Sequence, residues 1–205
     1  SQVLLGRAAL DDGSRLSGAK IIRYAHCDPH DLERLLIENR GNFPRCLVVT
    51  DGVFSMDGDM APLRELLALC GQHDAWLYVD DAHGFGVLGE QGRGSLSHFG
   101  IASKRVIYMA TLGKAAGVSG AFVAAEQVVI DTLVNQAHSY IYTTAAPPAL
   151  SVALSQSLQL IAQGDDLRTH LKQLIAQLRN GLADLPWQLM PSDTAIQPLL
   201  IGDNR

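Results

Sequence analysis

Short continuous runs of apolar residues alternate along the chain with longer stretches in which apolar residues recur at helical spacing. The continuous runs, which are typical of buried strands, lie at 19–25, 46–50, 75–81, 105–110 and 119–125. The periodic stretches predict helices over 28–40, 61–73, 126–138, 147–163 and 166–184. Unbroken apolar strands separated by helices favour an α/β fold, with a mostly parallel sheet that has helices on both faces.

Three of the predicted strands end in polar sequence. The stretches are VVTDGVFSMDGD after the second strand, VDDAHG after the third and MATLGK after the fourth. Ligands of open α/β sheets bind just beyond the carboxyl ends of the strands, so these stretches are where a site is expected. Side chains alternate in direction along a strand, and only one of the neighbouring Asp80 and Asp81 is therefore expected to face a ligand.

Composition excludes several classes of function. The chain has 205 residues and a net charge of −5, without a Lys/Arg cluster that would indicate nucleic-acid binding. No apolar run approaches membrane-spanning length, and no signal peptide opens the sequence. Three cysteines without paired spacing predict reduced core residues and a cytoplasmic protein. The chain lacks an initiator Met and stops after a strand-like run, so we expect a fragment that lacks both ends.

Each candidate residue has an ordinary interpretation when it is taken alone. Lys114 could be a loop lysine that reaches solvent, Asp80 a capping residue and His83 a satisfied loop histidine. The histidines show no HExxH spacing, so no metal site is predicted, and no GxSxG motif of a serine hydrolase is present. The stretch GEQGRG at 89–94 matches no phosphate-binding pattern and predicts a loop whose glycines have positive φ.

Pyridoxal phosphate accounts for the three strand-end features together. Its aldehyde needs a lysine in a partly dry pocket, its ring nitrogen an acidic partner, and its phosphate hydroxyl or amide donors. Lys114, Asp80 and His83 supply the amine, the carboxylate and a contact on the side of the ring's 3-oxygen. Ser55 and Thr111 are hydroxyl donors at neighbouring strand ends.

Four stretches together resemble the α-oxoamine synthase family of fold-type I pyridoxal-phosphate enzymes: TDGVFSMDGDMAPL, VDDAHGFGVLGEQGRGS, TLGKAAGVSGA and YIYTTAAPPA. The resemblance covers essentially the whole chain. It implies a pyridoxal-phosphate-binding large domain over 1–165 and the start of a smaller α+β domain over 166–205.

The resemblance also implies roles for single residues. Lys114 matches the Schiff-base lysine, Asp80 the partner of the ring nitrogen and His83 the histidine beside the 3-oxygen. Ser55 and Thr111 match hydroxyls that contact the cofactor. Thr143 and Thr144 match a segment that reaches the phosphate of a neighbouring subunit, which implies a homodimer with shared sites. Asp81 receives a structural role only.

The activity implied by the resemblance is the decarboxylative condensation of L-alanine with pimeloyl-CoA or a pimeloyl-carrier protein, as in biotin biosynthesis. Two departures stand against it. First, Arg7 occupies the position at which the family has a histidine that stacks on the cofactor ring. Second, the family's upstream phosphate loop and downstream carboxylate-binding arginine lie outside the chain. The chain by itself is therefore expected to be inactive. A sister synthase that uses glycine or serine and a non-catalytic paralogue both remain open.

Overall fold

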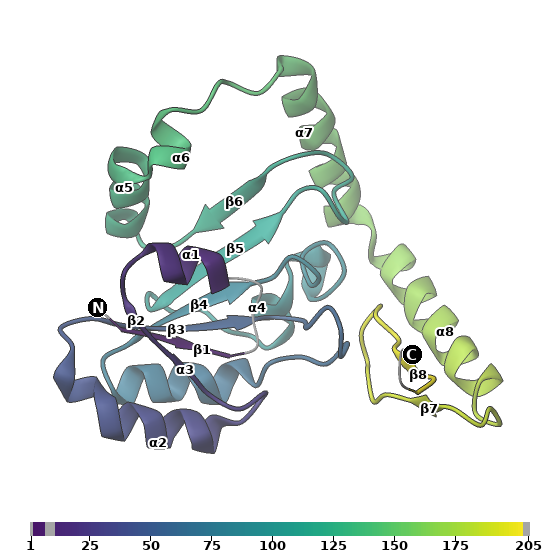
Figure 1. Ribbon diagram of the computed structural model, residues 1–205. Coiled ribbons are helices and arrows are strands. Elements are labelled where there is room, and N and C mark those ends of the chain that lie inside the picture. The colour runs from purple at the N-terminus through teal and green to yellow at the C-terminus, as the bar shows by residue number, and fades with distance from the viewer. Residues whose placement is uncertain (1, 7–10, 203–205) are drawn as a thin grey trace.

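The computed structural model describes residues 2–6 and 11–202. Its main sheet has six strands in the order β2-β1-β3-β4-β5-β6 (Figure 1). The first five are parallel and β6 is antiparallel to β5, which confirms the mostly parallel sheet. The strands are β1 (Gln2–Leu5), β2 (Lys20–Arg23), β3 (Cys46–Asp51), β4 (Trp76–Asp80), β5 (Val106–Thr111) and β6 (Ala121–Ala124).

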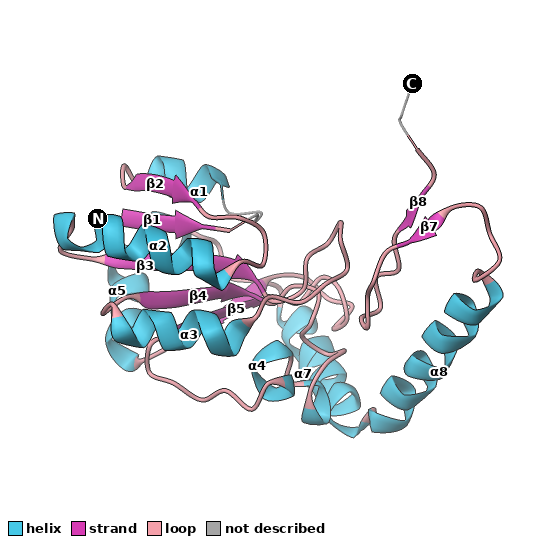
Figure 2. Cartoon of the chain, turned by 90° about the horizontal axis from the view of Figure 1, so that it is seen from below, coloured by secondary structure: helices cyan, strands magenta, loops and turns pink. Residues whose placement is uncertain are grey.

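One face of the sheet holds most of the hydrophobic core. The helices α2 (Pro29–Asn39) and α3 (Leu63–Gln72) lie side by side on this face (Figure 2). Their buried leucines pack against alternate residues of the central strands, among them Val48, Leu77 and Tyr108. Asp28 caps the N-terminus of α2, because its carboxylate accepts hydrogen bonds from two backbone N–H groups of the first turn.

The opposite face carries a smaller apolar cluster built on Val3, Leu5 and Val49. The short helix α1 (Asp11–Leu16) and the helix α5 (Gln127–Gln136) lie on this side of the sheet (Figures 1 and 2). Helices are thus found on both faces, as expected, but the two faces are unequal in the amount of core that they bury.

The remaining elements are helices, turns and a small strand pair outside the main sheet. They are α4 (Ser95–His98), α6 (His138–Ile141), α7 (Pro148–Gln163), α8 (Asp165–Gly181), the 3₁₀ turns Arg40–Asn42 and Glu90–Gly92, and a small antiparallel pair of β7 (Gln188–Leu189) with β8 (Leu199–Leu200). The domain boundary predicted at residue 165 coincides with the start of α8 and stays a prediction. Within the described residues, none of the helices has the length and apolar character needed to cross a membrane.

Candidate active site

Three strand ends are aligned at one edge of the sheet. Asp51, the last residue of β3, pairs in register with Asp80, the last residue of β4, and Asp80 pairs with Met109 of β5. The loops that follow these strands therefore leave the sheet at the same edge, and they carry the predicted residues Ser55, His83 and Lys114. This arrangement is the one that the strand-end rule predicts.

Lys114 and His83 meet between two of these loops. The Nζ atom of Lys114 lies 2.7 Å from Nε2 of His83, although 31 positions separate the two residues in sequence. Lys114 is exposed and His83 is half-buried, so the described residues do not enclose the lysine in the partly dry pocket that was expected. A protonated amine at this distance donates to an imidazole nitrogen, which places the ring proton of a neutral His83 on Nδ1.

The charge on His83 depends on its surroundings. Burial lowers the pKa of His83 below 6.5, and the positive charge of Lys114 lowers it further, while the carboxylate of Asp80 opposes both effects. Asp80 is itself buried, and one of its oxygens accepts the backbone N–H of Ala82 at 3.0 Å, which fixes the direction of the carboxylate. Amine, imidazole and carboxylate thus form one electrostatically linked group.

Asp81 turns away from this group and into the protein interior. It is completely buried, and its Oδ2 atom accepts hydrogen bonds from the backbone N–H of Ser95 and the hydroxyl of Tyr108, both at 2.7 Å. Burial raises the pKa of Asp81, and these hydrogen bonds partly offset that effect. The structure therefore agrees with a structural role for Asp81.

Glycines make room for the buried carboxylate of Asp81. A Cβ atom added at Gly52, Gly84 or Gly94 would overlap one of its oxygens. Gly94 also has a φ of +87°, which side chains rarely adopt, and it belongs to the 89–94 loop in which all three glycines have positive φ, as predicted. Spacing alone did not reveal that glycines of the segments after β3 and β4 converge on one carboxylate.

The loop that carries Lys114 is held from two sides. A Cβ atom at Gly86 would overlap that of Ala115, so this glycine allows the loop after β4 to pack closely against the lysine loop. From the other side, the Ser157 hydroxyl of α7 donates to the carbonyl of Ala116 at 2.7 Å. Contacts to the neighbouring residues therefore position Lys114 even though its side chain is exposed.

The remaining predicted residues lie outside the group formed by Lys114, His83 and Asp80. Thr111 ends β5 and bonds through its hydroxyl to the lysine loop, and Ser55 is exposed in the loop after β3. Thr143 and Thr144 are exposed in the linker between α6 and α7, which runs beyond β6 (Figure 1). Arg7 lies outside the described residues.

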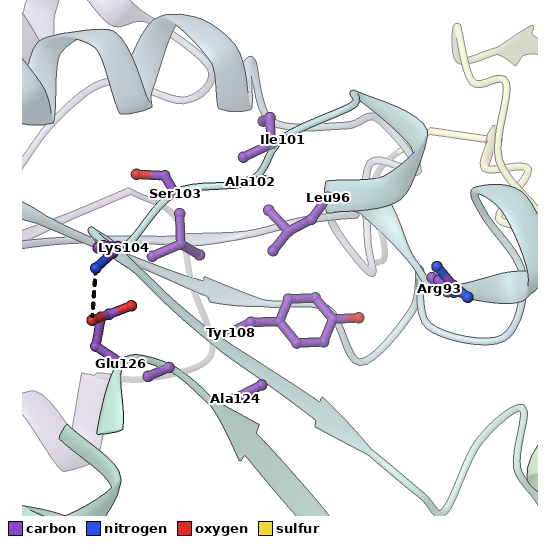
Figure 3. Close-up of a pocket in the computed structure, with 11 residues that line it drawn as sticks. Arg93, Leu96, Ile101, Ala102, Ser103, Lys104, Tyr108, Ala124 and Glu126 are labelled. Atoms are coloured by element: carbon purple, nitrogen blue, oxygen red, sulfur yellow. Dashed lines mark ion pairs between the residues drawn. The ribbon is translucent and has the colours of Figure 1, made fainter. Parts of the chain in front are cut away.

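A separate cavity of about 530 Å³ opens beside β5 and β6 (Figure 3). Tyr108 and Leu96 form part of its wall, and an ion pair of Lys104 with Glu126, 3.8 Å long, lies at one side. Its lining includes none of the predicted site residues. The candidate site at the strand ends, formed by Lys114, His83 and Asp80, is thus identified by the chemistry of its side chains and not by this cavity.

Sequence comparisons agree with the resemblance in the strand-end motifs. The chain is 59% identical over 200 residues to the 8-amino-7-oxononanoate synthase of Nitrosospira multiformis, covering 98% of this chain and 50% of that protein. It is 58% identical to the synthase of Aromatoleum aromaticum, with 98% and 51% covered. The chain therefore spans about half the length of the curated relatives that it matches.

Solved structures share the fold. A serine palmitoyltransferase of S. paucimobilis with PLP and myriocin bound superposes with a TM-score of 0.90 at 28% identity, over 99% of this chain and 54% of that one. An 8-amino-7-oxononanoate synthase of Francisella tularensis gives 0.79 at 32% identity, over 94% and 56%. The family model for aminotransferase class I and II matches residues 8–205. The chain belongs to the aminotransferase class I and II family.

Proposed function

We propose that the protein is a pyridoxal-phosphate-dependent acyltransferase. Its reaction would condense L-alanine with pimeloyl-CoA, or with a pimeloyl-carrier protein, to give 8-amino-7-oxononanoate, CoA and CO2. The observation that carries this proposal is the 2.7 Å approach of Lys114 to His83 at the strand end that Asp80 closes. The 59% identity to a relative that bears this name supports the choice of reaction.

The donor set fits pyridoxal phosphate. Lys114 offers an amine for the aldehyde, Asp80 a buried and oriented carboxylate for the ring nitrogen, and His83 an imidazole for the 3-oxygen side. Ser55 and Thr111 offer hydroxyl groups on the flanking loops. When bound, the cofactor supplies an electron sink that makes the α-hydrogen of an amino acid acidic.

Three residues of the chain would then hold or move protons in the reaction. The Asp80 carboxylate would hold the ring nitrogen in its protonated form, because an opposite charge favours the cationic form. Lys114 would be the base that accepts the α-proton of the amino acid. His83 stays neutral near pH 7 because its pKa is lowered, so its ring can accept a hydrogen bond from the Lys114 ammonium and keep the amine near the reacting carbon.

We further propose that the protein forms a homodimer in which each copy contributes residues to the site of the other. Thr143 and Thr144 are exposed in their linker, far along the chain from the strand ends, and are free to reach a second copy. Large apolar side chains on the same region are exposed too, among them Ile141, Tyr142 and Val152. Exposed apolar patches of this kind mark interaction surfaces. We also propose a cytoplasmic location, which the buried free thiols Cys46 and Cys70 support.

A sister synthase is the second candidate, because the serine palmitoyltransferase structures superpose at a higher TM-score than the oxononanoate synthase. A substrate panel separates the two. The purified full-length protein that contains this chain should release CoA and CO2 fastest from L-alanine with pimeloyl-CoA, compared with glycine or serine paired with acetyl-, succinyl- and palmitoyl-CoA. A preference for serine with palmitoyl-CoA would favour the sister synthase, and no turnover with any pair would favour a non-catalytic paralogue.

A further inference from the structure

A second cluster of reactive side chains lies outside the candidate active site. The backbone N–H of Asp28 donates to the carbonyl of Ala25 at 3.2 Å, which closes a turn between β2 and α2 with His26 and Cys27 at its centre. Cys27 has a φ of +51°, a value found mainly for glycine and asparagine at the third position of such a turn. Strained non-glycine residues of this kind are concentrated at functional sites.

Both side chains of the turn point at one carboxylate. The Oδ2 atom of Asp59 lies 2.8 Å from Nε2 of His26 and 3.5 Å from Sγ of Cys27, and Sγ lies 3.5 Å from Nε2. Asp59 belongs to the loop after β3 and is 32 positions from Cys27 in sequence. A nitrogen, a sulfur and an oxygen atom from two separate segments thus surround one point.

These separations match those of a tetrahedral zinc ion. With Zn–S near 2.3 Å and Zn–N and Zn–O near 2.0 to 2.1 Å, tetrahedral angles give about 3.6 Å for S–N, about 3.5 Å for S–O and about 3.3 Å for N–O. The observed sulfur distances agree to about 0.1 Å, and only the pair of His26 and Asp59, now in hydrogen-bond contact, must open by about 0.5 Å. A side-chain adjustment of that size needs no backbone change.

We propose that His26, Cys27 and Asp59 bind a Zn²⁺ ion, with solvent as the fourth ligand. The three residue types are those that zinc prefers, and two negative ligands would neutralise the ion. The side chains of His26 and Asp59 retain 30% and 34% of their accessible surface, so the ion has a path from solvent. The ring of His26 is held in place by Phe54, whose ring centre is 4.4 Å away.

Zinc binding would change the protonation of Cys27 and His26 but would involve no oxidation or reduction. The thiol proton of Cys27 passes to solvent as the Zn–S bond forms, and the hydrogen bond of His26 with Asp59 is replaced by two bonds to the ion. The ring of His26 then carries its proton on Nδ1, which leaves the Nε2 lone pair for the metal.

The ion would brace the loop that carries Ser55. Asp59 lies on the returning side of this loop, next to Gly58, whose carbonyl accepts hydrogen bonds from Ser192 at 2.7 Å and Thr194 at 2.8 Å. Zinc would add a link from the same loop to the β2–α2 turn. The site would therefore act by holding the loop in place, and it would not take part in the reaction itself.

Zinc titration of the cofactor-loaded protein, without a polyhistidine tag, tests the proposal. After treatment with a chelator, the wild type should bind one Zn²⁺ per chain, measured by elemental analysis and by competition with a chromogenic chelator. Cys27→Asn removes the thiolate while keeping a residue that tolerates positive φ, and it should weaken binding by at least about tenfold. The matched control His30→Gln changes an exposed histidine nearby and should leave the affinity unchanged.

A second readout reports on the cysteine directly. Zinc should protect Cys27 from alkylation in the wild type, as followed by mass spectrometry of the peptide that contains it, and circular dichroism should show that Cys27→Asn is folded. Zinc affinity that survives Cys27→Asn would place the ion elsewhere and overturn the proposal, as would a wild type that binds no zinc. None of these readouts depends on turnover or on the identity of the substrates.

Discussion

The buried carboxylate of Asp81 provides a quantitative test of how the strand-end loops are held together. Replacing Asp81 by alanine removes the only acceptor that the structure shows for the Tyr108 hydroxyl and for the Ser95 N–H among the described residues. Both donors are buried, with Tyr108 8% exposed and Ser95 0% exposed. Each buried donor left without a partner costs about 1 to 3 kcal/mol. We therefore expect Asp81→Ala to lower the free energy of unfolding by about 2 to 6 kcal/mol.

Asp81→Asn is the matched control. Its amide oxygen can take the place of Oδ2 and accept from both Ser95 and Tyr108, so its cost should be only about 1 kcal/mol, the difference between a charged and a neutral acceptor. The amide group has the same number of heavy atoms as the carboxylate, so the substitution leaves no cavity between the surrounding glycines.

The two variants also differ in their dependence on pH. Because burial raises the pKa of Asp81 above 3.8, the folded protein binds this proton more tightly than the unfolded chain does. The contribution of Asp81 to stability is therefore full at acidic pH and is lost as pH rises from 3.8 through the folded-state pKa. Asp81→Asn lacks this proton, so its stability relative to the wild type should improve as pH rises through that window.

Urea denaturation at several pH values measures these differences. The free energies of unfolding of the wild type, Asp81→Ala and Asp81→Asn should be compared with tryptophan fluorescence as the signal. An Asp81→Ala variant within about 0.5 kcal/mol of the wild type near pH 7 would refute the hydrogen-bond argument. A stability difference between Asp81→Asn and the wild type that stays constant with pH would refute the raised pKa.

Three further predictions concern the loops around the candidate site. Gly94→Ala should destabilise the protein by at least about 2 kcal/mol, because φ is +87° and the added Cβ overlaps the buried carboxylate, and an unchanged urea midpoint would contradict this. Lys114→Met should raise the pKa of His83 toward 6.5 by removing a nearby positive charge, as followed by NMR titration, and a fall would contradict the assigned cause. Ser157→Ala should cost about 1 kcal/mol and speed amide exchange in the loop of Lys114, whereas unchanged exchange would count against this anchor.

The sequence predicted the elements of the sheet better than their directions. The pattern of apolar runs located β2 to β6 to within a few residues, because burial on both faces leaves a continuous apolar run. It did not show that β6 is antiparallel, since an apolar run is the same in either direction. The strand β1 was missed because its four residues lie at the start of the chain and offer too short a run.

The candidate site was predictable where its residues follow strand ends. That His83 and Lys114 lie together beyond Asp80 was predictable, because the edge of a parallel sheet collects the loops that follow its strands. Contacts made by side chains far apart in sequence were not predictable. The hydrogen bond of Tyr108 to Asp81 spans 27 positions and that of His26 to Asp59 spans 33, and no local spacing encodes either.

The central claim is that Lys114 forms the covalent link to pyridoxal phosphate. The purified full-length protein that contains this chain should be incubated with the cofactor, reduced with borohydride and digested, and the peptides should be analysed by mass spectrometry. We predict a phosphopyridoxyl group on Lys114, absent from Lys114→Met, with the exposed Lys104 unmodified as an internal control. A wild type that carries no adduct on Lys114, or that carries it on another lysine, would contradict the account.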